Sequence, residues 1–82
     1  MGRLSMVSGE AYPLKAGQYQ YVIDITSGTS TFAISQDGGS TFNDMTNGTF
    51  SADADGTMSV GAGAQVRVTN SGTAVVSLFK IQ

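Results

Sequence analysis

Gln18-Tyr-Gln-Tyr-Val-Ile-Asp-Ile-Thr26 shows the clearest alternation of side chains in the sequence. Its side chains alternate, so that one face carries Tyr19, Tyr21, Ile23 and Ile25 and the other carries Gln18, Gln20, Val22, Asp24 and Thr26. A period of two is typical of a β-strand with one buried face. Aromatic pairs on such a face usually belong to a core, so this stretch predicts a strand packed against a second layer.

Similar short runs occur along the rest of the chain, separated by turns rich in Gly, Asn and Asp. The runs are 30–36, 41–45, 49–52, 57–60, 65–69 and 73–81, with turns expected at 27–29, 37–40, 47–48, 53–56, 61–63 and 70–72. Turn signals at this close spacing favour a sandwich or barrel. We therefore predict an all-β fold, a small antiparallel β-sandwich or open barrel of six to eight short strands.

The last run, 73–81, differs from the first because it is apolar on both faces. Val75, Phe79 and Ile81 lie on one face, and Ala74, Val76 and Leu78 on the other. This pattern is typical of a strand covered on both sides. Either the sheet folds over into a second layer, or a neighbouring chain covers the second face.

Residues 1–17 show no period and contain Pro13, the only proline. We interpret them as an extended N-terminal arm, followed by a β domain at 18–82. A terminal segment without its own period is mobile unless something holds it. The arm is expected to lie on another subunit through its apolar residues, which are Leu4, Met6, Val7, Tyr12 and Leu14.

Composition argues against an enzyme. The 82 residues make one domain at most and include neither cysteine nor histidine. The usual zinc, copper and iron ligand sets and the standard catalytic triads are therefore missing. No catalytic residue, cofactor, metal site or small-molecule substrate is predicted, and a minimal hydrolase is disfavoured. Because disulfides and structural metals are excluded, association with other chains is the remaining means of stabilising so small a domain.

Charge and hydropathy limit the partners further. The net charge is −2, and the four basic residues, Arg3, Lys15, Arg67 and Lys80, are scattered along the chain. Nucleic-acid binding needs clustered basic residues, so it is not expected. The sequence has no apolar stretch long enough to span a membrane. The first residues lack the apolar run of a secretory signal, so we expect synthesis in the cytoplasm without a signal peptide.

Ser35-Gln-Asp-Gly-Gly-Ser-Thr-Phe42 resembles the Asp-box, a hairpin motif of sialidases and other propeller proteins. The resemblance implies that Asp37 accepts hydrogen bonds from turn N–H groups and that Gly39 takes the tight conformation. It also implies that Thr41 completes the turn and that Phe42 packs inward. A propeller needs at least four blades of ~40 residues, which this chain does not hold. The motif therefore predicts a structural hairpin without glycosidase activity.

Asp53-Ala-Asp-Gly56 has a partial likeness to a calcium loop. An EF-hand loop needs further oxygen ligands, a glycine one place later and a distal glutamate. A polar turn is the better interpretation, and no calcium binding is predicted here.

Ile34-Ser-Gln-Asp-Gly-Gly-Ser-Thr-Phe42, followed by Thr46-Asn-Gly-Thr-Phe50, is similar to segments of phage virion and fibre proteins. With its Ser/Thr/Gly-rich, cysteine-free composition and N-terminal arm, the chain resembles the head-decoration (cement) proteins of tailed bacteriophages. The resemblance implies a non-enzymatic protein of the virion surface that binds and stabilises the assembled shell through its arm and β domain, the arm lying on a neighbouring subunit or on the capsid surface. Its partners would be the major capsid protein and neighbouring copies of itself, as a homotrimer or homodimer. The alternative is a carbohydrate- or receptor-binding module of a phage tail fibre.

Overall fold

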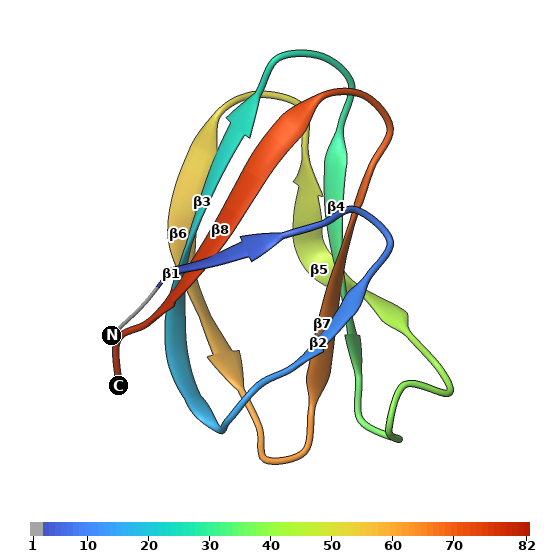
Figure 1. Ribbon diagram of the computed structural model, residues 1–82, viewed down its shortest axis with the longest axis vertical. Helices are drawn as coiled ribbons and strands as arrows, with labels where there is room; N and C mark the ends of the chain where they lie inside the picture. Colours follow the sequence, from blue (N-terminus) through green and yellow to red (C-terminus); the bar gives the residue numbers. More distant parts are fainter. Residues whose placement is uncertain (1–2) are drawn as a thin grey trace.

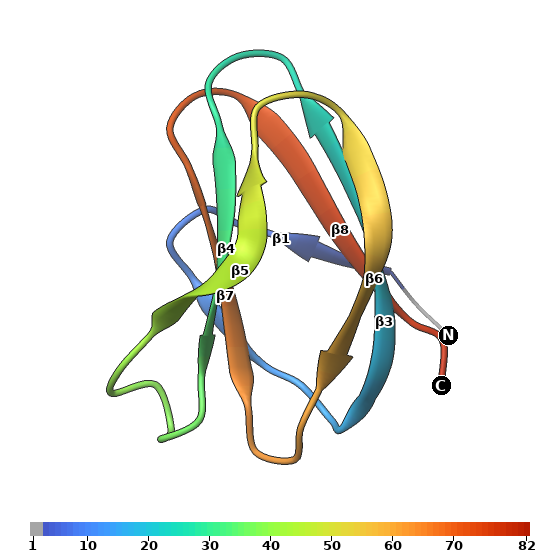
Figure 2. The same cartoon turned by 180° about the vertical axis from the view of Figure 1, so that it is seen from behind.

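The computed structural model describes residues 3–82, which form eight strands and the loops between them. The strands are β1 (Arg3–Met6), β2 (Ala11–Pro13), β3 (Gly17–Ile25), β4 (Ser30–Ser35), β5 (Asn43–Phe50), β6 (Ala54–Val60), β7 (Gln65–Asn70) and β8 (Ala74–Lys80). They form two four-stranded antiparallel sheets that face each other (Figure 1 and Figure 2). The predicted small antiparallel β-sandwich is confirmed, with eight strands, and residues 3–82 contain no helix.

The strands pair symmetrically about the middle of the chain. The turn at 36–42 joins β4 to β5, and outward from it β3 pairs with β6, β2 with β7 and β1 with β8. Successive pairs alternate between the sheets, which gives the orders β1-β8-β3-β6 and β2-β7-β4-β5. This double wrapping is the topology of an eight-stranded jelly roll. The turn at 36–42 is therefore the midpoint of the whole arrangement.

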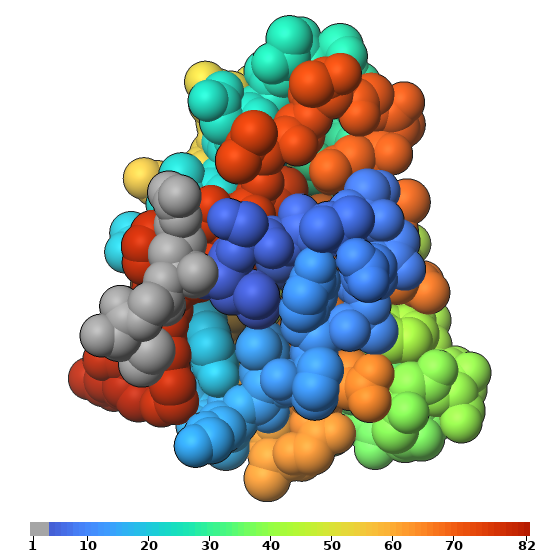
Figure 3. All heavy atoms as spheres, in the orientation of Figure 1, coloured from blue at the N-terminus to red at the C-terminus, as the bar shows by residue number. Residues whose placement is uncertain are grey.

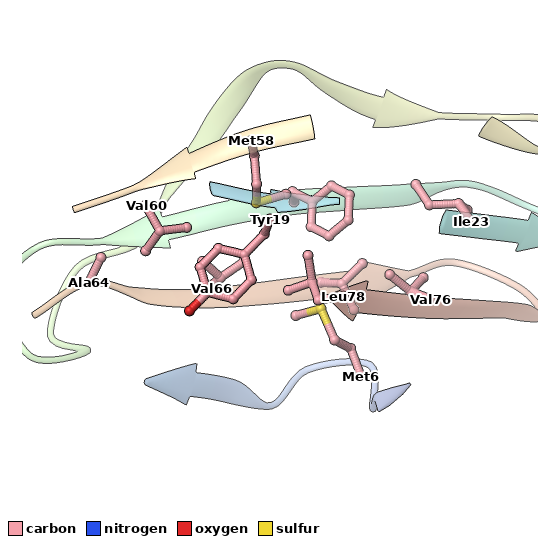
Figure 4. Packing of buried hydrophobic residues seen from close by; sticks show 11 residues of the cluster. Met6, Tyr19, Ile23, Met58, Val60, Ala64, Val66, Val76 and Leu78 are labelled. Carbon is pink, nitrogen blue, oxygen red and sulfur yellow. The ribbon is translucent and has the colours of Figure 1, made fainter. Parts of the chain in front are cut away.

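The core lies between the two sheets and follows from the alternation of the strands. On β3, Tyr19 and Ile23 are buried while Val22 and Asp24 are exposed, as the period of two predicts. Figure 4 shows inward-pointing side chains from several strands meeting in one cluster. The residues buried in it are Met6, Tyr19, Ile23, Phe32, Met58, Val60, Ala64, Val66, Val68, Val76 and Leu78.

The first 17 residues are not an arm separate from the domain, and this part of the prediction is wrong for the residues that the structure describes. β1 and β2 are edge strands of the two sheets, paired with β8 and β7 respectively. The segment crosses from one sheet to the other and lies against the body of the molecule (Figure 3). One domain therefore comprises residues 3–82.

The apolar residues of this segment mostly face the protein's own core. Met6 is only 7% exposed, and its side chain reaches Leu78 between the sheets (Figure 4). Leu4, Tyr12 and Leu14 pack against the same cluster. These four side chains therefore pack on the protein's own core, which differs from the predicted contact with another subunit, and Val7 alone of the five is exposed.

Two expected turns are also displaced. Asn47-Gly48 does not form a hairpin but lies within β5, where Asn47 has a φ of 57° and the register with β4 shifts between Thr31 and Ala33. Asn47 supplies the positive φ at the place where β5 bulges away from β4, and the chain does not reverse there. The turn expected at 53–56 lies at 51–53, because Asp55 and Gly56 continue the pairing of β6 with β3.

Candidate functional site

The exposed large hydrophobic side chains lie on one sheet, β1-β8-β3-β6, either on the outer face of a strand or just beyond a strand end. Val75 of β8 is 61% exposed, and Val22 of β3 is 40% exposed. Ile81, just beyond β8, is 49% exposed, and Val7, just beyond β1, is 55% exposed. Isolated exposed hydrophobic residues are ordinary, but a group on one face is typical of an interaction surface.

The strand register places Val22 beside Val75 and Phe79. Val22 lies opposite Ser77, and Ser77 lies opposite Ser5 on its other side. Val75 and the half-buried Phe79 flank Ser77 along β8 and point to the same face. Val7 comes one residue after the Met6–Val76 pair, which brings it to the Val75 end of β8. We call Val7, Val22, Val75, Phe79 and Ile81 the apolar patch.

The sheet folds over into a second layer, which is one of the two arrangements expected from the apolar residues on both faces of 73–81. Val76 and Leu78 are buried in the core, whereas Val75 and Ile81 remain exposed. The second sheet covers one face of β8 only. Of the predicted arm residues, Val7 alone joins this surface.

Acidic side chains border the apolar patch on the β3–β6 side. Asp24 lies opposite Val75, and Asp55 lies opposite Val22. Together with Asp53 these carboxylates line a hollow of about 400 Å³ between the ends of β3 and β6. The surface as a whole combines apolar side chains with a negatively charged rim, which suits a partner that presents apolar groups beside lysine or arginine.

Sequence reasoning missed Val22, Asp24 and Asp55 as parts of this surface. Val22 and Asp24 were placed on the polar face of their strand, and Asp55 was placed in a turn. The available signal was that Val22, a β-branched residue, interrupts an otherwise polar face. Its proximity to Val75 depends on the pairing of β3 with β8, which the sequence pattern alone does not give.

The carboxylates at the hollow have partly structural roles. The Oδ1 atom of Asp53 accepts a hydrogen bond from the Ile25 N–H at 2.8 Å, which ties the β5–β6 loop to the end of β3. Within residues 3–82, no three acidic side chains are arranged as a metal-binding group.

The hairpin at 35–42 has the geometry that the Asp-box resemblance implies. The Asp37 Oδ1 atom accepts hydrogen bonds from the Thr41 N–H at 2.9 Å and the Ser35 hydroxyl at 2.8 Å. The Ser35 hydroxyl oxygen in turn accepts the Gly39 N–H at 2.9 Å, and Gly39 has a φ of 95°. The Thr41 N–H, followed by the Ser35 hydroxyl, lowers the pKa of Asp37 from its ordinary value of 3.8.

Phe42 differs from its expected position because it does not enter the core between the sheets. It lies on the outer face of the second sheet, where the Arg67 guanidinium carbon is 4.3 Å from the centre of its ring. Val66 and Val68 point inward from the same strand, so Arg67 has to point outward. The motif therefore closes the hairpin onto the sheet surface.

Aromatic side chains at the opening between β5 and β6 form packing contacts, as the alternation predicts. The rings of Tyr21, Phe32 and Phe50 have centroid separations of 5.3 Å, 5.5 Å and 6.2 Å. They line a cavity of about 90 Å³ that Met45 and Met58 also border. Small-molecule sites usually enclose ~300–1,000 Å³, so this cavity is a gap in packing that opens at a sheet edge.

No protein-family model matches the chain, and none of the curated proteins or solved structures compared with it is significantly similar. Nor do residues 3–82 include a helix capable of crossing a lipid bilayer.

Proposed function

We propose that this protein is a non-enzymatic structural component of a tailed-bacteriophage virion, a decoration (cement) protein that binds the assembled shell and stabilises it. The observation that carries the proposal is the apolar patch on the outer face of β8 and β3, where Val75 is 61% exposed. The second sheet leaves this face uncovered, and an apolar face exposed to water is stabilised by docking on another protein.

The chemistry of the patch favours a protein surface over a small substrate. Val22, Val75 and Ile81 are aliphatic and lie on a sheet face, whereas small-molecule sites are concave. Asp24 and Asp55 at the rim add the polar border that protein interfaces usually have. The proposed partner is the major capsid protein, with the patch lying on its apolar and basic surface residues.

Location and assembly follow from the same proposal. A decoration protein acts on the outside of the capsid, in many copies, and contacts neighbouring copies of itself. The resemblance of the segments at 34–42 and 46–50 to phage virion proteins supports this setting. The compact sandwich supplies a rigid support on which the apolar patch is presented without induced folding.

Copy number on the particle is the experiment that tests the proposal. Purified particles of the phage that encodes the chain would be analysed by quantitative mass spectrometry against the major capsid protein. A decoration protein is expected to have a copy number per particle of the same order as that of the major capsid protein. A ratio typical of a tail-fibre tip, or absence from the particle, would contradict the proposal.

A second candidate is the carbohydrate- or receptor-binding module, and one observation favours it. The hollow of about 400 Å³ lined by Asp24, Asp53 and Asp55 offers carboxylate acceptors to sugar hydroxyl groups. A glycan array probed with the intact chain and with Asp24→Asn distinguishes the two candidates. Binding that requires Asp24 would support the sugar-binding function, and a blank array would leave the decoration function as the sole proposal.

A further inference from the structure

Three of the four sheet edges carry features that hinder pairing with another strand. β1 has four residues, and β2 has three and includes Pro13, which has no N–H to donate. β5 is interrupted by the bulge at Asn47, where its register with β4 shifts. Short strands, proline and bulges are the devices by which proteins protect sheet edges.

The fourth edge, β6, lacks these devices. Its seven residues, Ala54–Val60, pair in unbroken register with β3 and contain neither proline nor a bulge. β6 lies at the end of the order β1-β8-β3-β6, and Figure 2 shows it at the outside of its sheet. Its outward side chains, Asp55, Thr57 and Ser59, are exposed. An exposed edge strand of this length, with regular pairing on its other side, is a template for strand addition.

We propose that two copies of this chain pair antiparallel along β6, about a two-fold axis that passes through Thr57. The two four-stranded sheets then join into one continuous sheet of eight strands. This interface is the self-association surface of the oligomer, and the argument for it depends on the strand edges and not on the proposed function. Two-fold pairing of identical edges is closed, so it gives a dimer and not a fibre.

The charges of β6 favour this register. With Thr57 opposite itself, Asp55 lies opposite Ser59, so each carboxylate faces a hydroxyl group. Centring the pair on Asp55 would oppose two carboxylates, which is destabilising. Because Tyr21 lies over Gly56 and Met58 is only 7% exposed, the side chains that meet across the pair are those of the outer face.

In this arrangement the partner's strand lies beside the cavity at the β5–β6 opening. Thr57 and Met58 line it from β6, and Tyr21 lines it from β3. A partner strand beside β6 extends the sheet along this opening. The interface therefore covers apolar atoms in addition to pairing the free N–H and C=O groups of the edge.

Two-fold pairing also orients the apolar patches. Directly opposed residues of an antiparallel pair point to the same face of a sheet. The outer faces of both copies consequently lie on the same side of the joined sheet, so a dimer presents two patches to one surface. Two linked sites bind a repetitive surface more tightly than one by raising the effective concentration.

Sedimentation of the purified full-length chain, without any capsid, tests the interface separately from the function. The unmodified chain is expected to form dimers. Thr57→Lys and Thr57→Glu place like charges opposite each other and should each give monomers, whereas an equimolar mixture should restore dimers through a Lys–Glu pair. Ser59→Lys, opposite Asp55, should lower the dissociation constant. Thr69→Lys, at an exposed site on β7, is the control and should remain dimeric.

Circular dichroism of each variant checks that it is folded, as expected for substitutions at exposed positions. A monomeric unmodified chain would overturn the proposal, as would a higher oligomer. A dimer that Thr57→Lys leaves intact would also overturn it, because residue 57 would then not face its own copy. If an equimolar mixture of Thr57→Lys and Thr57→Glu stays monomeric, the proposed register is wrong.

Discussion

Asp24 of β3 lies directly opposite Val75 of β8 on the outer face of the first sheet. Val75 is the most exposed of the large hydrophobic residues, at 61%, and Asp24 is an exposed carboxylate. An aliphatic side chain bordered by a negative charge is suited to a partner with an apolar centre and a basic surround. These two neighbouring residues belong to the surface to which we assign function.

Asp37 is expected to hold the central hairpin in a pH-dependent way. Asp37→Ala removes the acceptor for the Thr41 N–H and should lower the thermal midpoint by a few degrees at pH 7, while Asp37→Asn should lower it less. The folded pKa of Asp37 is lowered below 3.8, so its contribution is present above that pH and is lost as the pH falls through the folded pKa. The difference in midpoint between the intact chain and Asp37→Ala, measured from pH 7 down to pH 2, should therefore narrow. A constant difference would contradict this role.

Met6 is expected to stabilise the domain from within. Met6→Ala leaves a cavity beside Leu78 and should reduce the free energy of unfolding by about 2–5 kcal/mol in urea titrations. Val7→Ala, at the neighbouring exposed position, is the matched control and should change the free energy of unfolding by less than ~0.5 kcal/mol.

Deleting residues 1–14 should unfold the chain, because the deletion removes both β1 and β2. A folded deletion variant would restore the view that this segment is a separate arm.

Position 56 is expected to require glycine, because the ring of Tyr21 lies over the backbone there. A methyl group added at Gly56 would lie 2.5 Å from the Tyr21 hydroxyl oxygen, so the ring would have to move. Gly56→Ala should therefore destabilise the fold by about 1–3 kcal/mol. Gly61→Ala is the control, since the nearest atom to a methyl group there is a Gln36 nitrogen at 3.9 Å. Equal unfolding midpoints for the two variants would contradict this explanation.

Calcium is not expected to bind at residues 53–56. Asp53 is engaged with the Ile25 N–H, and Asp55 points outward from a paired strand. Addition of calcium or of a chelator should therefore leave the thermal midpoint unchanged. Calorimetric titration that gives a dissociation constant in the micromolar range would overturn this prediction.

The sequence predicted the parts of the fold in which one face of a strand is buried. The alternation around Ile23 is visible because nine residues of β3 cross the whole sandwich. β1 and β2, with four and three residues, are too short to show a period, so Met6 could not be assigned to the core. Its burial depends on the pairing of β1 with β8, which joins the two ends of the chain.

Local signals were informative about backbone conformation but less so about topology. Asn47 does take a positive φ, as the Asn-Gly pair suggests, yet the chain continues along the same strand because β4 still has residues to pair. The apolar outer face of β8 is likewise predicted from Val75 and Ile81 alone. That Val22 belongs to the same apolar patch follows only from the register between β3 and β8.

We propose that the apolar patch attaches the protein to the viral shell. The direct measurement is retention of Val75→Lys on capsids that lack the native protein, compared with the unmodified chain and with Thr69→Lys on the opposite sheet. Both variants change exposed residues and should fold normally, which circular dichroism would verify. We predict that the unmodified chain and Thr69→Lys co-sediment with the capsids and that Val75→Lys does not. Equal retention of all three proteins would contradict the account.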